Sequence, residues 1–249
     1  MSMTQETRPR LLAHERDRRA ASGRLGGLRP RRLGFVSALV LVLASGLPAE
    51  GQAALKVARL KYGGGGDWYA NPTGIPRLLA EVRKRTTIDV APQPDTVEPG
   101  SPRLFDYALL FATGHGNIVF TLAECENLRQ YLLKGGFLHV DDNYGLDKAF
   151  RREVKKLFPD RPLVELPHSH PIYHCLYSFP AGLPKIHEHH GGPPHGYGII
   201  HEGRVILFYT YNTDINDGWE APEVHNDPPE LLEQALRMGV NIVVYALTH

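Results

Sequence analysis

The hydrophobic and polar positions of residues 54–249 follow two periods in turn, which predicts short strands separated by helices. Short apolar or alternating runs between turn residues predict strands at residues 55–61, 88–90, 107–112, 137–140, 163–166, 199–201 and 205–209. Apolar positions three and four apart predict helices at residues 76–85, 122–134, 147–157 and 231–247. This order favours an α/β fold, in which a single doubly wound, mostly parallel sheet carries helices on both faces, as in flavodoxin-like domains. We therefore expect residues 54–249 to form one domain.

The ends of three predicted strands carry polar residues, at residues 113–116, 139–143 and 212–219. Sheets of this kind bind ligands beyond the carboxyl ends of their strands, so we expect the three segments to meet at one site. The candidate catalytic residues in them are Asp141, Asp142, Asp214 and His115. The candidate pocket residues are Gly114, Asn143, Trp219 and His225.

Asp141 and Asp142 directly follow a buried strand, where an unpaired carboxylate is costly. One interpretation is that they bind a metal ion or act in acid–base catalysis. In the other, Asp142 caps the next helix or bonds the backbone of the loop. Trp219 has two interpretations as well, because it can border a pocket or simply pack in the core.

Histidine is the unusual residue of this chain, with 13 copies, of which eight lie within residues 168–201. Imidazole and carboxylate groups are the ligands of zinc and of similar divalent metal ions. The candidate metal ligands are His170, His174, His187, His189 and Asp142. The alternative is a polar loop whose histidines bond backbone carbonyl groups.

The first 53 residues have the pattern of a secretory signal peptide. Residues 1–33 are rich in arginine, residues 35–47 are apolar, and small residues follow Pro48. An apolar run of this length is short for a membrane span. We expect export by a Sec-type signal to the periplasm or the outside of the cell. The alternative is an uncleaved segment that anchors the chain in the inner membrane.

Composition and motifs exclude several classes of function. The chain is 42% hydrophobic and 22% charged, which is typical of a globular protein. Acidic residues outnumber basic ones after residue 53, so binding to nucleic acid is not expected. Residues 63–66 are four glycines without the spacing of a nucleotide-binding loop, and the chain lacks the G-x-S-x-G motif of serine hydrolases. Cys125 and Cys175 are expected to be buried apolar residues rather than nucleophiles.

Four stretches resemble the bacterial family known as domain of unknown function 4159. They read TGHGNIVFTLAECENLRQYLLKGGFLHVDDNYG, LPHSHPIYHCLYSFP, TDINDGWEAPEVHNDP and GVNIVVYALTH. The resemblance implies a fold similar to class I glutamine amidotransferases and to the trehalose-utilisation type of domain. It also gives weight to the regions of Asp141, His170 and Asp214. The parent fold usually has a cysteine or another reactive group after the strand that ends here at Ala112. This chain has Thr113-Gly114-His115 there, so amidotransferase chemistry is not implied.

These observations lead to three hypotheses. The first is an exported metal-dependent hydrolase, with a metal-bound water as nucleophile and Asp141 or Asp214 as general base. The second is a non-catalytic module that binds a small molecule or a partner in the cell envelope. The third is a metal carrier or a surface that responds to pH, because many histidines titrate near neutrality.

Overall fold

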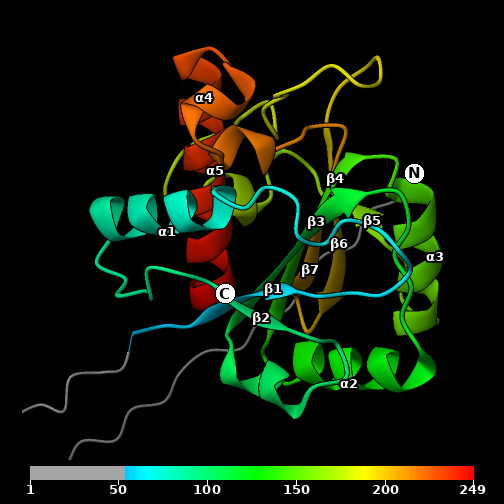
Figure 1. Cartoon of the computed structure of the whole chain (residues 1–249). Helices are drawn as coiled ribbons and strands as arrows, with labels where there is room; N and C mark the ends of the chain where they lie inside the picture. Colours follow the sequence, from blue (N-terminus) through cyan, green and yellow to red (C-terminus); the bar gives the residue numbers. More distant parts are fainter. Residues whose placement is uncertain (1–53) are drawn as a thin grey trace, which may run out of the picture. The chain divides into compact units, whose positions relative to one another are not determined.

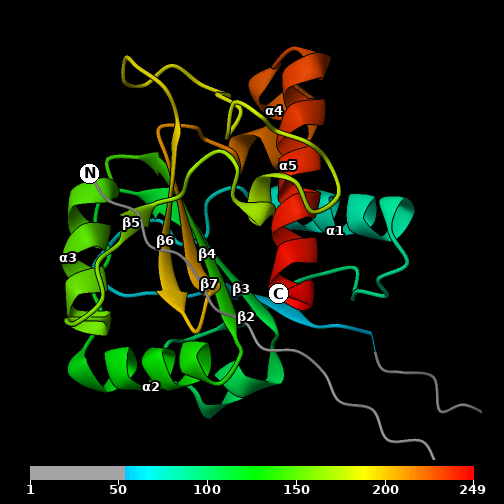
Figure 2. The same cartoon turned by 180° about the vertical axis from the view of Figure 1, so that it is seen from behind.

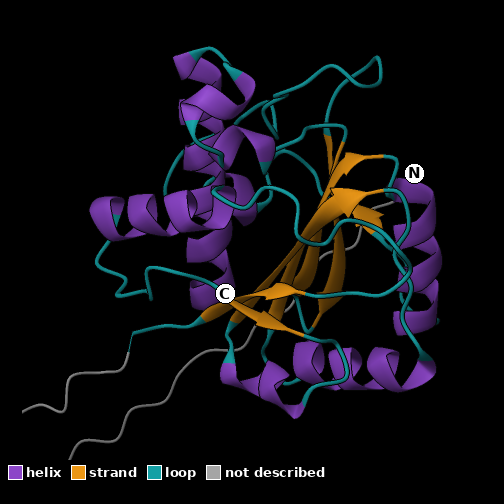
Figure 3. Cartoon of the chain, in the orientation of Figure 1, coloured by secondary structure: helices purple, strands orange, loops and turns teal. Residues whose placement is uncertain are grey.

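A computed structural model describes residues 54–249, and their strands form one seven-stranded sheet (Figures 1 and 3). The strands are β1 (Val57–Leu60), β2 (Asp95–Val97), β3 (Leu109–His115), β4 (Phe137–Tyr144), β5 (Val164–Glu165), β6 (His195–His201) and β7 (Arg204–Tyr211). Their order across the sheet is β2-β1-β3-β4-β7-β6-β5. Strand β6 is antiparallel to both of its neighbours, and every other neighbouring pair is parallel. The predicted α/β fold with a mostly parallel sheet is confirmed.

Helices cover both faces of this sheet (Figures 1 and 2). On one face, α1 (Gly74–Arg85) and α5 (Pro229–Thr248) pack Leu78 and Val240 into a core with Phe111. On the other face, α2 (Leu122–Leu133) and α3 (Asp147–Leu157) pack Leu128 and Phe150 against Leu110. Leu110 and Phe111 therefore pack in different cores, because successive side chains of a strand point to opposite faces of the sheet. The shorter helices are η1 (Pro102–Asp106), η2 (Pro171–Tyr173), η3 (Asp217–Trp219) and α4 (Pro222–His225).

One predicted strand is wrong. Val90 makes only an isolated bridge to Leu55, and the edge strand β2 forms instead at Asp95–Val97, inside a proline-rich segment for which the sequence predicts neither strand nor helix. Pro92 cannot donate a hydrogen bond to continue the pairing of Val90. The chain pairs with β1 again only after Pro94, at the edge of the sheet, where proline is tolerated.

Strands β3 and β4 run further than expected. Thr113 pairs with Asp141 and Gly114 with Asp142, so the polar residues are the last residues of the strands rather than a loop after them. Strand β7 runs parallel to β4, and residues 212–219 leave it at the same edge. Strand β6 begins at this edge because it is antiparallel to β7, with His195 opposite Tyr211. The histidine-rich segment before β6 is thereby brought to the carboxyl ends of the parallel strands.

The predicted signal peptide at residues 1–53 lies outside the described residues. Within residues 54–249, no helix is both long enough and apolar enough to cross a membrane.

A candidate metal centre at the carboxyl ends of the strands

His187 lies among three carboxylates. Its Nδ1 atom is 3.1 Å from Asp214 Oδ2 and 3.2 Å from Asp217 Oδ2. Its Nε2 atom, on the other side of the ring, is 3.1 Å from Asp227 Oδ1. The hydrogen bonds with Asp214 and Asp217 raise the pKa of His187 to about 10, although its partial burial opposes this. Both ring nitrogens are therefore directed at carboxylate oxygens.

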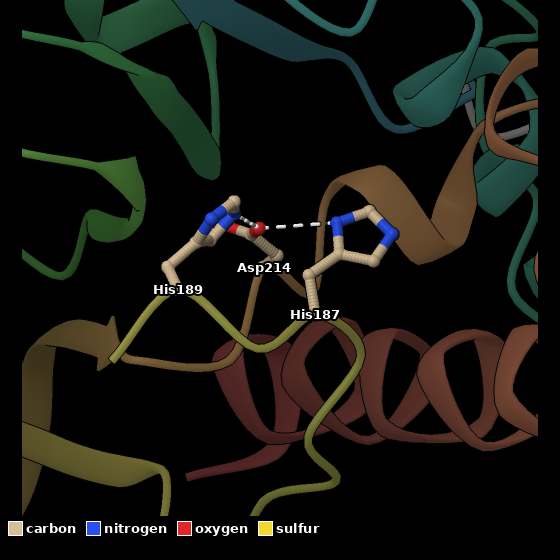
Figure 4. A group of neighbouring side chains, drawn as sticks. All are labelled: His187, His189 and Asp214. Carbon is tan, nitrogen blue, oxygen red and sulfur yellow. Dashed lines mark hydrogen bonds and ion pairs between the residues drawn. The ribbon is translucent and has the colours of Figure 1, made fainter. Parts of the chain in front are cut away.

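Asp214 also contacts a second histidine, His189, whose Nε2 atom lies against the same Oδ2 atom (Figure 4). The backbone of Asp214 is left-handed, with a φ of 57°, and its side chain is only 1% exposed. Its Oδ1 atom is buried and has no hydrogen-bond partner among the described residues. Burial raises the pKa of Asp214, while the hydrogen bond with His187 opposes the shift. A strained, buried carboxylate with an unused oxygen is a feature of functional sites.

Asp217 is fixed by amide groups at one oxygen and faces histidines with the other. Its Oδ1 atom accepts hydrogen bonds from Nδ2 of Asn71 and from Nδ2 of Asn143, the latter at 3.1 Å. Asn143 is itself fixed, because its Oδ1 atom accepts a 2.5 Å hydrogen bond from Thr113 Oγ1. Burial alone would raise the pKa of Asp217, but the hydrogen bonds from His187 and Asn71 lower it overall. Asp217 is therefore ionised, with its Oδ2 atom facing His187.

Glu220 and His225 form a further pair beside Asp217. His225 Nε2 is 3.2 Å from Glu220 Oε2 and 3.7 Å from Asp217 Oδ2. The other oxygen of Glu220 accepts hydrogen bonds from the backbone nitrogen of Thr73 at 3.2 Å and from its hydroxyl at 3.0 Å. One oxygen of Glu220 is thus anchored to the start of α1, and the other faces His225.

The segment that carries His187 and His189 is docked onto the residues that follow β7. The backbone nitrogen of Ile186 donates to the carbonyl of Thr213 at 2.8 Å. Nδ2 of Asn212 donates to the carbonyl of Pro193 at 3.0 Å, and Asn212 has a left-handed φ of 58°. These contacts place the two histidines over Asp214.

The sequence matches the family described as "Domain of unknown function (DUF4159)" over residues 56–247. The chain belongs to the DUF4159 family. A comparison with curated proteins finds no match. The matched family is one of unknown function, so the contacts of this chain's own residues carry the functional evidence.

Two predicted ligands of the DUF4159 domain lie apart from this cluster. His170 accepts a hydrogen bond from the backbone nitrogen of Ile172 at 3.2 Å, and its ring lies 5.5 Å from that of Tyr245. His174 Nε2 is 2.7 Å from the carbonyl oxygen of His168. Of the five expected metal ligands, only His187 and His189 come together, in a group with Asp214. Asp217 contacts the same Nδ1 atom of His187 and forms a second group with His187 and His225. The spacing of the histidines along the chain does not distinguish His187 and His189, which meet Asp214, from His170 and His174, whose rings bond within their own loop.

The oxygens of Asp141 and Asp142 are used within the fold. Asp141 accepts hydrogen bonds from Thr210 Oγ1 at 2.5 Å and from the backbone nitrogen of Asn216 at 2.9 Å. Burial, reinforced by the neighbouring Asp214, raises the pKa of Asp141 to about 8. Asp142 accepts a 2.8 Å hydrogen bond from the backbone nitrogen of Leu146, at the start of α3. Burial also raises the pKa of Asp142. The contacts of Asp142 are those of the capping interpretation rather than those of a metal ligand.

His115 pairs with an acid that the sequence did not suggest. Its Nδ1 atom is 2.9 Å from Asp67 Oδ2, and its backbone nitrogen donates to Asp67 Oδ1 at 2.5 Å. His115 is paired in the sheet with Tyr144, whose ring lies 4.8 Å from that of His189. His115 therefore borders the same edge of the sheet but does not belong to the cluster.

The four candidate pocket residues have different environments. Asn143 orients Asp217, and His225 faces Glu220, as described above. Gly114 lies against Tyr62 and Asp67, and a Cβ atom there would be 2.2 Å from the Tyr62 hydroxyl. Trp219 is fully buried and donates from Nε1 to the carbonyl of Ala235 at 2.8 Å. Of the two interpretations of Trp219, its contacts fit packing in the core of the DUF4159 domain rather than bordering a pocket.

Asn71 and Thr73 were missed in the sequence. Both precede α1, far from the histidines along the chain, and both orient carboxylates of the cluster through hydrogen bonds. The only local feature of Asn71 is its position before a proline. Its left-handed φ of 55° becomes evident only in the structure.

The cluster suits a divalent metal ion. Bonds of about 2.0–2.2 Å place the donor atoms of a tetrahedral site roughly 3.3–3.6 Å apart. The 3.1 Å and 3.2 Å separations of His187 Nδ1 from Asp214 and Asp217 are close to this spacing. Without a metal ion, a protonated His187 donates to carboxylates from both nitrogens. With an ion at Nδ1, a neutral His187 still donates to Asp227, which is the usual arrangement of a metal-bound histidine.

Proposed function

We propose that this DUF4159 domain is a metal-dependent hydrolase, whose divalent ion is bound by His187, His189, Asp214 and Asp217. The observation that carries the proposal is the position of His187. One ring nitrogen faces two carboxylates that can share an ion with it, and the other is oriented by a third carboxylate, Asp227. Two imidazoles and two carboxylates are a ligand set for zinc or a similar ion.

The ion would activate a water molecule. A metal ion can lower the pKa of its bound water to about 7, which supplies a nucleophile without a cysteine or serine. The unpartnered Oδ1 atom of Asp214 could accept the proton of that water, because Oδ2 faces His187 and would be the oxygen that binds the ion. The side chain of His189 is 36% exposed, so one side of the centre is open to water and substrate. Open coordination positions are characteristic of catalytic rather than structural metal sites.

We also propose that the domain works outside the cytoplasm. This rests on the arginine-rich and apolar segments within residues 1–53, which have the order of a signal peptide.

The test is a metal analysis of the full chain, purified without a histidine tag. We expect at least one equivalent of zinc or a similar metal by mass spectrometry, and removal by EDTA should lower the melting temperature. His187→Ala should lose the metal. His174→Ala is the matched control, because His174 contacts only its own loop, and it should retain the metal.

Two results would contradict this proposal. One is substoichiometric metal that EDTA removes without any change in melting temperature. The other is equal metal content in His187→Ala and His174→Ala. If metal is bound but a panel of ester, amide and phosphate substrates is not hydrolysed, the domain is a metal-binding module without catalysis.

A further inference from the structure

A second set of potential ligands adjoins the first. It consists of His225 Nε2, Glu220 Oε2 and Asp217 Oδ2, and the histidine nitrogen is 3.2 Å from the glutamate and 3.7 Å from the aspartate. Among the described residues, His187, Asp217 and His225 form a group whose ligand atoms lie within 4.8 Å of one another, and Glu220 adjoins this group through its contact with His225. The proposed first ion does not use His225 or Glu220.

The carboxylates of this second set are oriented in advance. Asp217 receives hydrogen bonds from Asn71 and Asn143 on Oδ1, so that Oδ2 faces the histidines. Glu220 receives two hydrogen bonds from Thr73 on Oε1, so that Oε2 faces His225. In each case the amide or hydroxyl partner leaves one oxygen available. Such outer partners fix the direction of metal ligands and strengthen binding.

Asp217 has the position of a bridging ligand. Its Oδ2 atom lies 3.2 Å from His187 Nδ1 and 3.7 Å from His225 Nε2, so it faces a ligand of each set. Hydrolases with two metal ions hold them about 3.5–4 Å apart and bind the attacking and leaving oxygens between them. Because Asp217 Oδ2 faces both His187 and His225, the carboxylate could bind both ions at once.

The charges favour two divalent ions over one. Four carboxylates surround His187 and His225, those of Asp214, Asp217, Glu220 and Asp227. One divalent ion balances two of these charges, and two ions balance all four. Among the described residues, no lysine or arginine side chain hydrogen-bonds to any of these four carboxylates. Arg59 and Arg77 lie nearby but donate to the backbone carbonyls of Asn71 and Glu220.

We propose that the centre binds a second divalent ion through His225 and Glu220, bridged to the first by Asp217, and that the pair hydrolyses phosphate esters. This inference rests on the proposed function, because it adds an ion and a substrate class to the same centre. Without a basic side chain bonded to the cluster, the two ions supply the positive charge that an anionic phosphate needs.

The reaction is a simple hydrolysis. The oxygen of a metal-bound water forms a bond to phosphorus, and the proton of the water passes to Asp214 Oδ1 and then to solvent. The bond from phosphorus to the ester oxygen breaks, and the alcohol leaves with its electron pair and takes a proton from solvent. Water and a phosphate ester give an alcohol and inorganic phosphate.

The experiment counts ions and measures phosphate binding on the full chain. Manganese is titrated by calorimetry, and its electron paramagnetic resonance spectrum is recorded with and without inorganic phosphate. We expect two ions with a spin-coupled signal in the wild type, and one ion without coupling in His225→Ala and Glu220→Gln. Phosphate affinity should fall at least tenfold in both variants. Glu220→Gln keeps the size of the side chain, and circular dichroism verifies that each variant is folded.

Glu223→Gln is the matched control, because Glu223 is an exposed acid on the same short helix as His225. It should bind two ions and phosphate as the wild type does. The second site is overturned if the wild type binds only one ion. It is also overturned if the wild type binds two ions and both His225→Ala and Glu220→Gln still bind two. Either result leaves the proposed function intact. Two ions without phosphate binding overturn the substrate class. A wild type that binds no ion at all overturns the proposed function itself.

Discussion

Asp227 lies 3.1 Å from the Nε2 atom of His187, on the side of the ring that faces away from Asp214 and Asp217. The side chain of Asp227 is 11% exposed, and it immediately precedes Pro228 and Pro229, where α5 begins. The segment before α5 thus supplies a carboxylate that orients a histidine from the loop before β6. A hydrogen bond to the far nitrogen fixes both the tautomer and the direction of a metal-binding imidazole.

Asp227→Asn should therefore weaken metal binding without abolishing it. The amide keeps the shape of the side chain but loses its charge, and changes to such outer partners cost about 10–100-fold in metal affinity. Zinc affinity is measured by competition with a chromophoric chelator. Asp160→Asn is the control, since Asp160 is an exposed turn residue, and its affinity should equal that of the wild type. Equal affinities in both variants would show that Asp227 does not act on the metal through His187.

Much of the fold could be predicted because its information is local. Helix α2 begins at a capping box in which Thr121 and Glu124 bond each other's backbone nitrogens, and both residues are visible in the sequence. Strand β3 was predicted because it is apolar on both faces. Strand β2 could not be predicted, since Asp95, Thr96 and Val97 become a strand only by pairing with β1.

The candidate site was predicted by region but not by residue. His170 and His187 both lie in histidine-rich loops, and their sequences do not differ in any way that predicts their contacts. They differ because Thr213 and Asn212 hold the segment of His187 over Asp214, which is a relationship between distant parts of the chain. Asp141 lies near the end of the buried strand β4 and Asp214 follows β7, but the oxygens of Asp141 are satisfied by Thr210 and Asn216.

Substitutions of Asn212 should separate its two roles. Asn212→Ala removes the hydrogen bond to Pro193 and also places an alanine at a φ of 58°, which costs about 1–2 kcal/mol. Asn212→Gly removes the same hydrogen bond but tolerates this backbone conformation. Urea unfolding should therefore show a larger loss of stability for the alanine variant. Both variants should bind metal more weakly than the wild type, because the loop of His187 loses its anchor. Unchanged metal affinity in both would refute the role of Asn212 in placing the loop.

Gly114 and Gly116 provide a test of close packing at the end of β3. Both have positive φ, at 145° and 78°, so alanine is unfavourable on the backbone of either. At Gly114 the new Cβ atom would also meet the hydroxyl of Tyr62 and the carboxylate of Asp67, whereas at Gly116 it would meet no atom within 4 Å. Overpacking costs about 1–3 kcal/mol, so Gly114→Ala should lose that much more stability than Gly116→Ala in urea unfolding. Equal losses would mean that Tyr62 and Asp67 move aside freely.

The ion pair of Glu233 with Arg85 should make a defined contribution to acid stability. Hydrogen bonds from Arg85, with further support from Arg237, lower the pKa of Glu233 from 4.5 to about 2, although partial burial opposes the shift. The two guanidinium nitrogens of Arg85 lie 2.9 Å and 2.8 Å from the two carboxylate oxygens, and the pair joins α1 to α5. Because the folded pKa is the lower one, the stabilisation is complete above pH 4.5 and is lost as the pH falls towards 2.

Glu233→Gln should therefore be less stable than the wild type at pH 7, and the difference should shrink between pH 4.5 and pH 2. The glutamate is 39% exposed, so solvent screening limits the difference to about 1 kcal/mol or less. The measurement is urea unfolding at several pH values in EDTA, which keeps metal binding out of the comparison. Glu230→Gln is the control, because Glu230 is an exposed acid at the start of the same helix. A difference between wild type and Glu233→Gln that stays constant down to pH 2 would show that Arg85 does not stabilise the charged form of Glu233.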